Sequence, residues 1–223
     1  MRDTRQYEFL DRLRFGQTPE ERKEALRALK VLESESDFDD NSLLELLENE
    51  DLIFQTYAIG SVGRRKYQGG IPKLKELYIR SNNPLVLVEL LEAFYQFGSD
   101  DFIDVVLNRL KKQGKKFWHK WTGSSTKVGK YENDLLLDQI LTPSLKYFQL
   151  TGSQKLAKQI LPYLNYEDSN VRWHTLVTCD KLGIVIDDDK LSKIEETEPN
   201  GLVREQAAII KEKRNRLTLQ NEE

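Results

Sequence analysis

The chain has 223 residues and a mass of 26.1 kDa, enough to bury a sizeable core as one structural unit. Charged residues make up 32% of it and hydrophobic residues 39%, a balance typical of many short amphipathic helices with solvated outer faces. The net charge is only −3, which excludes a global basic field for nucleic acid or an anionic membrane, so any such attraction must be local.

Cysteine usage and apolar runs bear on the compartment. The first fifteen residues contain no apolar run suited to a signal peptide, and no stretch approaches the roughly 18 apolar residues of a membrane span. Cys179 is the only cysteine, which rules out an intramolecular disulfide and favours a reducing compartment. We therefore expect a soluble, cytoplasmic protein without a membrane partner.

Start and stop residues mark the first two helices. Residues 3–15 carry a rough apolar stripe, and Gly16 follows it. Thr18, with Pro19 next and Glu21 three residues on, has the pattern of a helix capping box. The apolar residues after it recur at helical spacing, which predicts a second helix with one buried face.

An acidic block comes next. From Val31 to Gly63 the chain has nine acids and no Lys or Arg, the sharpest charge asymmetry in the sequence. One interpretation is a solvated loop with helix N-termini, where carboxylates favour the helix dipole. The other is a docking patch for a basic partner. The acids that we assign to this patch are Asp37, Asp39, Asp40 and Glu48.

Part of the block imitates a calcium-binding loop. The residues at positions 1, 3, 5 and 12 of that template are Asp37, Asp39, Asn41 and Glu48. Ser42 stands at position 6, where the loop needs glycine for its sharp turn. Ser42 with Glu45 also fits a helix capping box. We therefore predict no metal site in this segment.

Glycines recur at intervals close to the length of one helix pair. They stand at Gly63, Gly98, Gly152 and Gly183. Glycine just after a helix accepts the left-handed backbone conformation cheaply, so each is expected to end a second helix. The intervals are 35, 54 and 31 residues, and the long middle one indicates an insertion.

Two segments resemble a known repeat family. The run KLAKQILPYLNYE and the following DSNVRWHTLVTCDKLG together resemble the HEAT repeat, a family of stacked helix pairs. The matching residues are Leu161, Pro162, Asp168, Val171, Arg172 and Gly183. Residues 69–98 resemble HEAT-like units of the phycobilisome-lyase type. Val203, Arg204 and Ala207 repeat the Val-Arg signature near the C-terminus.

The resemblance implies an all-α fold. It implies a right-handed α-α superhelix of about five helix pairs, an armadillo-like solenoid, extending over residues 1–223 as a single domain. By the same resemblance, the arginine of the Val-Arg pair contacts a turn acid along the stack, and Asp168 is the expected partner of Arg172.

The long interval holds a basic and aromatic segment, residues 111–134. From Arg109 to Tyr131 there are eight Lys and Arg side chains and no acid, and two of the three tryptophans fall here. Its glycines and small polar residues predict a loop with a short helical turn at most, and function often resides on such loops. The expected partner-binding residues are Lys115, Lys116, Phe117, Trp118, His119, Lys120, Trp121, Lys127, Lys130 and Tyr131.

Trp118 and Trp121 are the expected anchors of that surface, because tryptophans bury large areas at interfaces whereas lysines alone mainly steer. The alternative is that these rings fold back and fill the groove between neighbouring helix pairs. The sequence leaves both interpretations open.

The sequence offers little for catalysis. Residues 123–130 have five residues between their glycines where a P-loop has four, and no strand precedes them. His119 and His174 have no further ligand at metal-binding spacing, and Cys179 reads as a small buried residue. We expect no metal, no cofactor, no small-molecule substrate and no enzymatic activity.

The leading hypothesis is a protein-binding scaffold or adaptor, such as an immunity-type inhibitor that masks a toxin, with salt-dependent association. The alternative is nucleic-acid binding through residues 109–131, with lysines on phosphates and tryptophans stacked on bases. A HEAT-like DNA glycosylase extends that alternative by fold analogy only. A chromophore-lyase-like module is suggested by residues 69–98, but no residue specifies it.

Overall fold

The structure is a computed structural model that describes residues 4–34, 38–121 and 132–220. The regular structure in these ranges is helical, without a strand, which confirms the all-α prediction. The chain divides into two compact units, Met1–Phe97 (unit 1) and Gly98–Glu223 (unit 2).

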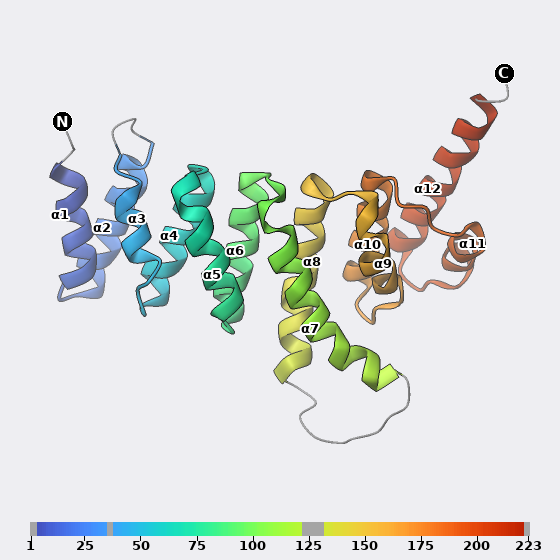
Figure 1. Cartoon of the computed structure of the whole chain (residues 1–223), viewed down its shortest axis with the longest axis horizontal. Coiled ribbons are helices and arrows are strands. Elements are labelled where there is room, and N and C mark those ends of the chain that lie inside the picture. Colours follow the sequence, from blue (N-terminus) through green and yellow to red (C-terminus); the bar gives the residue numbers. More distant parts are fainter. Residues whose placement is uncertain (1–3, 35–37, 122–131, 221–223) are drawn as a thin grey trace. The chain divides into compact units, whose positions relative to one another are not determined.

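Unit 1 consists, in its described residues, of three helix couples (Figure 1). Helix α1 packs on α2, α3 on α4 and α5 on α6, and α4 also packs on α6. The bounds are α1 Thr4–Phe15, α2 Pro19–Leu32, α3 Asn41–Leu46, α4 Leu52–Arg64, the 3-10 turn η1 Gln68–Gly70, α5 Ile71–Arg80 and α6 Pro84–Phe97.

Unit 2 likewise has three couples in its described residues. Helix α7 packs on α8, α9 with the 3-10 helix η4 packs on α10, and α11 packs on α12; α10 also contacts α8 and α12. The bounds are η2 Asp100–Phe102, α7 Ile103–Trp121, α8 Glu132–Thr151, η3 Gln154–Leu156, α9 Ala157–Ile160, η4 Leu161–Asn165, α10 Ser169–Leu182, α11 Asp188–Thr197 and α12 Gly201–Gln220.

The capping box at the start of α2 is confirmed. The Thr18 hydroxyl accepts from the Glu21 N–H at 3.2 Å, and the Glu21 carboxylate accepts from the Thr18 N–H at 3.3 Å. The second capping box was predicted wrongly, because α3 begins at Asn41. There the Ser42 hydroxyl donates to the Asp39 carbonyl at 2.7 Å and accepts from Gln6 of α1, so a tertiary contact takes the place of the local cap.

The four marker glycines divide into two kinds. Gly98 and Gly183 have φ of 62° and 64° and end α6 and α10 in the left-handed conformation, as predicted. Gly63 lies inside α4, and Gly152 does not have a positive φ. At Gly63 a Cβ would lie 2.7 Å from the Ala93 Cα. The glycine is therefore required where α4 crosses α6, a tertiary reason that spacing alone does not show.

Arg172 pairs with Glu198 rather than with the expected Asp168. Its Nε and Nη2 donate to the two carboxylate oxygens of Glu198 at 2.8 and 2.6 Å, a bidentate geometry suited to the planar guanidinium. This hydrogen bonding lowers the pKa of Glu198. The Asp168 carboxylate instead accepts two backbone N–H bonds in the first turn of α10 and acts as its N-cap.

The two Val-Arg sites of unit 2 share one local geometry. Arg172 donates through Nη1 to the carbonyl oxygens six and five positions before it, at 2.6 and 2.7 Å. Arg204 does the same through its Nη1, at 2.6 and 3.1 Å. Each arginine thus holds the turn that precedes its own helix, and the acid bound by Arg172 lies in the turn held by Arg204.

The start of the basic and aromatic segment is helical, which corrects the loop prediction for residues 111–121. Helix α7 continues to Trp121. In the sequence, positions 107, 110, 114, 117 and 121 follow one another at the three- and four-residue spacing of one helix face. Four of them are apolar residues, and position 114 is glycine. A single helical glycine costs only about 1 kcal/mol relative to alanine, so the lysine-rich composition obscured a continuous helix.

The close approach of α4 and α6 generates a prediction. Gly63→Ala places a methyl group against the Ala93 backbone, which cannot move without displacing α6. We expect the free energy of unfolding to fall by about 1–3 kcal/mol, measured by urea denaturation followed by circular dichroism.

Gly201→Ala is the matched control. A Cβ at Gly201 would meet only the end of the Arg204 side chain, at 3.8 Å, and alanine favours helix over glycine. This variant should be neutral or slightly stabilising. Equal effects of the two substitutions would contradict the packing account of Gly63.

Candidate functional site

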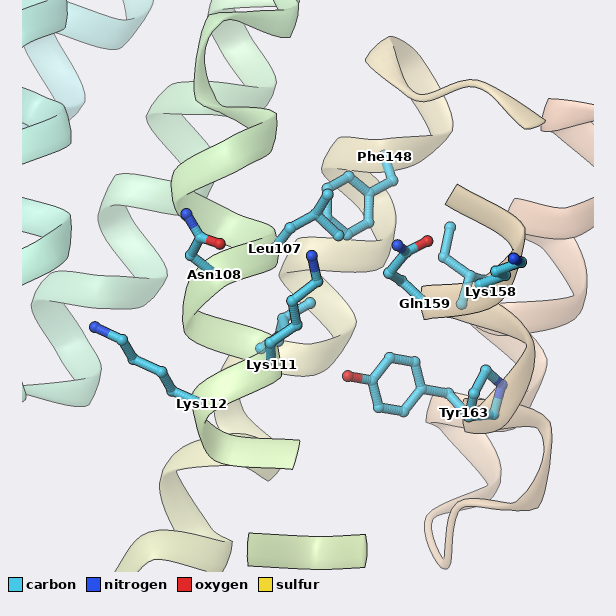
Figure 2. Close-up of a pocket in the computed structure, with 11 residues that line it drawn as sticks. Leu107, Asn108, Lys111, Lys112, Phe148, Lys158, Gln159 and Tyr163 are labelled. Carbon is cyan, nitrogen blue, oxygen red and sulfur yellow. The ribbon is translucent and has the colours of Figure 1, made fainter. Parts of the chain in front are cut away.

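A cleft within unit 2, formed by described residues, is a candidate functional site. It lies between α7 and α8 on one side and α9 and η4 on the other, and it has a volume of about 570 Å³ (Figure 2). We call it the lysine cleft, after the three lysines that line it, Lys111, Lys112 and Lys158.

Helix α7 supplies one wall of the lysine cleft. Leu107 and Leu110 are buried by the apolar stripe of the helix, whereas Lys111 and Lys112 are exposed. Lys111 stands four residues after Leu107, so the two lie on the same helix face. The wall therefore has an apolar base with a cation above it.

The opposite wall comes from a helix that lasts little more than one turn. α9 ends at Ile160, and η4 continues the chain with Pro162 near its start. Leu156, Ile160 and Leu164 recur every four residues and are buried. Because α9 and η4 pack on α10, the remaining positions are left to line the cleft.

The polar groups on this wall are the Lys158 ammonium, the Tyr163 hydroxyl and the Gln159 amide. Lys158 is exposed, and Figure 2 shows Tyr163 pointing across the cleft toward α7. Burial raises the pKa of Tyr163 to about 12, and a tyrosine hydroxyl is protonated and can donate at neutral pH even without this shift. The Gln159 side chain also lines the space, and its buried Oε1 has no hydrogen-bond partner among the described residues.

The floor of the cleft is apolar. Phe148 of α8 is 1% exposed and Ile160 also 1% exposed, and Leu107, Leu110 and Pro162 complete the apolar lining. The ring of Tyr163 packs edge-on against Tyr166 at a centroid distance of 6.2 Å. Most of the floor is thus fixed by the same burial that holds the helices together.

Charge gives the cleft its chemical character. No carboxylate is among the described residues that line it, and none of its three lysines is in an ion pair with a described residue. Cations above an apolar floor raise the local positive potential, because the low-dielectric walls focus the field. The arrangement suits a ligand with both a negative charge and an apolar group.

The structure describes only part of the predicted partner-binding surface. For Lys115, Lys116, Phe117, Trp118, His119, Lys120 and Trp121 it gives the helical backbone of α7 but not the side chains. Lys127, Lys130 and Tyr131 lie outside the described residues. Whether Trp118 and Trp121 bind a partner or pack on the helices therefore stays a prediction.

The described acids of the predicted docking patch are engaged within unit 1. Asp40 pairs with Arg65, and Asp39 accepts from the Tyr7 hydroxyl. Glu48 pairs with Arg80 at 2.7 Å, and this hydrogen bonding lowers the pKa of Glu48. It also pairs with Lys73 at 3.4 Å.

Asp37, the fourth member of that patch, lies outside the described residues. Asp40 and Glu48 are paired with cations of unit 1, so their charge is compensated before any protein arrives, whereas the Tyr7 hydroxyl that donates to Asp39 is neutral. The acidic block consequently offers a weaker field than its sequence suggests.

The other residues considered for chemistry are buried. Burial raises the pKa of the Cys179 thiol to about 12, which keeps it protonated and unreactive at neutral pH. Burial also lowers the pKa of His174, with the nearby Lys146 as the second cause. The His174 Nδ1 has no hydrogen-bond partner in the described structure.

Within the described ranges, no three His, Cys, Asp or Glu side chains converge on a point that would hold a metal ion. None of the described helices is both long and apolar enough to cross a membrane. No family model matches the chain, and no curated protein is significantly similar to it in sequence.

The partner-binding residues expected from the sequence include none of the three lysines that line the cleft. Lys111 and Lys112 fall within the predicted segment 111–134, but Lys158 and Tyr163 were not predicted. A signal was present, because Lys158 and Gln159 stand between the buried positions 156 and 160. It shows that they face away from the core, but not what they face.

The shielding of Tyr163 can be measured directly. The absorbance at 295 nm of the wild-type chain minus that of Tyr163→Phe reports the ionisation of this hydroxyl. Because burial disfavours the phenolate, the difference should stay flat through pH 10 and rise only near pH 12. A step near pH 10 would show that the hydroxyl is solvated like that of an ordinary tyrosine.

Proposed function

We propose that this chain is a non-enzymatic protein-binding module, built as a HEAT-like right-handed solenoid, whose partner is negatively charged where the two proteins meet. The lysine cleft is the observation that carries the proposal, since it combines three cations without an ion pair to a described residue and an apolar floor. Charge complementarity of this kind speeds association and fixes orientation.

The repeated helix couples support the solenoid part of the proposal. Each couple packs on its neighbours within its unit, and the turn-holding arginines recur at Arg172 and Arg204. Such stacks commonly serve as surfaces for partners. An adaptor or an immunity-type inhibitor fits this description, and the location proposed for it is the cytoplasm.

Nucleic-acid binding through residues 109–131 is the second candidate. The eight Lys and Arg side chains of this range favour it, and phosphate contacts would make binding strongly salt-dependent. The described cleft lining contains no carboxylate for glycosylase-type chemistry, so this candidate is proposed as a binding function only.

A pull-down from native lysate with the tagged full chain separates the two candidates. After nuclease treatment we expect one defined protein to remain bound, and its capture to decline as salt rises from about 50 to 300 mM, because screening weakens the charge contacts. Loss of all captured material after nuclease treatment would contradict the proposal and favour nucleic acid.

A further inference from the structure

We propose that the lysine cleft binds an acidic peptide segment of the partner, with one apolar side chain on the cleft floor and carboxylates at Lys111 and Lys158. This inference rests on the protein-binding function proposed above and specifies the chemistry of the segment recognised. It concerns only described residues of unit 2.

The size of the cleft fits a short segment. Its volume of about 570 Å³ falls within the range of about 300–1,000 Å³ found for ligand sites. Leu107, Phe148 and Ile160 are largely buried and close the bottom of the cleft. The apolar surface that a ligand can reach comes from Pro162 and the Tyr163 ring, which are partly exposed. A Leu, Ile or Phe side chain of the segment would pack on these two residues, and the remaining space would hold its neighbours.

The positions of the lysines in the cleft predict where the carboxylates of the bound segment would lie. Lys111 belongs to α7 and Lys158 to α9, and both line the cleft. In Figure 2 the Lys111 side chain extends into the space between the walls, whereas the Lys158 side chain stays beside α9. Two carboxylates that flank a central apolar residue would each meet one lysine. The Tyr163 hydroxyl, directed across the space, adds a donor for a carboxylate or a backbone carbonyl.

The same lining argues against nucleic acid in this cleft. Single-stranded nucleic acid is held mainly by bases stacked on exposed aromatic faces. Phe148 is 1% exposed, so Tyr163 is the one ring of the described lining that a base could reach, whereas successive bases need successive rings. Lysines beside a small partly exposed apolar surface match an acidic peptide better.

Peptide display tests the inference on the full chain. A random peptide library on phage is panned against the immobilised protein, and we expect the enriched peptides to carry two or more Asp or Glu next to Leu, Ile or Phe. A synthetic peptide of the enriched sequence should bind Lys111→Glu/Lys158→Glu at least tenfold more weakly than the wild-type chain.

The matched control is Lys155→Glu/Lys181→Glu. Both lysines are exposed in unit 2, neither lines the cleft, and the change in net charge is the same. The peptide should bind this variant within about twofold of the wild-type affinity. Should the first variant melt early, Lys111→Gln/Lys158→Gln removes the cations without reversing charge, and it should also weaken binding.

Several outcomes would overturn the inference. The panning could enrich no peptide, or enrich peptides that lack Asp and Glu. Peptide affinity could fall equally in both charge-reversed variants. A random oligonucleotide could displace the peptide, with its own binding dependent on Lys111 and Lys158. Binding of 4-phenylbutyrate as tightly as the best peptide would assign the cleft to small carboxylates instead. If a captured protein partner binds the variant Lys111→Glu/Lys158→Glu normally, the protein-binding function stands while this site for it falls.

Discussion

Burial of one apolar stripe per helix is the constraint on which the structure depends. Most helices of this chain are short, and each packs on the other helix of its couple. Within a unit, the second helices of neighbouring couples also pack on one another, α4 on α6, α8 on α10 and α10 on α12. Where two stripes must come very close, side-chain volume becomes limiting, as at Gly63 beside Ala93. In unit 2 the same constraint shapes the lysine cleft, because the short α9 and η4 turn their buried residues toward α10 and leave the side facing α7 open.

The net charge of −3 hides a local difference between paired acids in unit 1 and, among the described residues, unpaired lysines around the cleft in unit 2. Five described acids of the acidic block are in ion pairs with arginines or lysines of unit 1, namely Glu33, Asp40, Glu45, Glu48 and Asp51. In unit 2, Glu198 is paired with Arg172. The lysines of the cleft have no such partner among the described residues. The uncompensated charge around the cleft is therefore positive, which is why the proposed partner segment is acidic.

Local signals in the sequence predicted the fold class and several boundaries. Thr18, Asp168 and Gly183 act through neighbours within a few residues, so the start of α2 and both ends of α10 were predictable. Contacts between distant residues were not. The bond from Arg172 to Glu198 spans 26 positions, and the cleft joins side chains of α7 with those of α9 and η4. A sequence pattern shows that such residues face away from the core without showing what they face.

Amide hydrogen exchange of the full chain, alone and with the captured protein partner, tests the central claim most directly. If the lysine cleft is the binding site, the partner should slow exchange at residues 107–112 of α7 and 157–163 of α9 and η4, and should leave α4 and α6 unchanged. Slowed exchange confined to unit 1, with the cleft segments unaffected, would contradict the account.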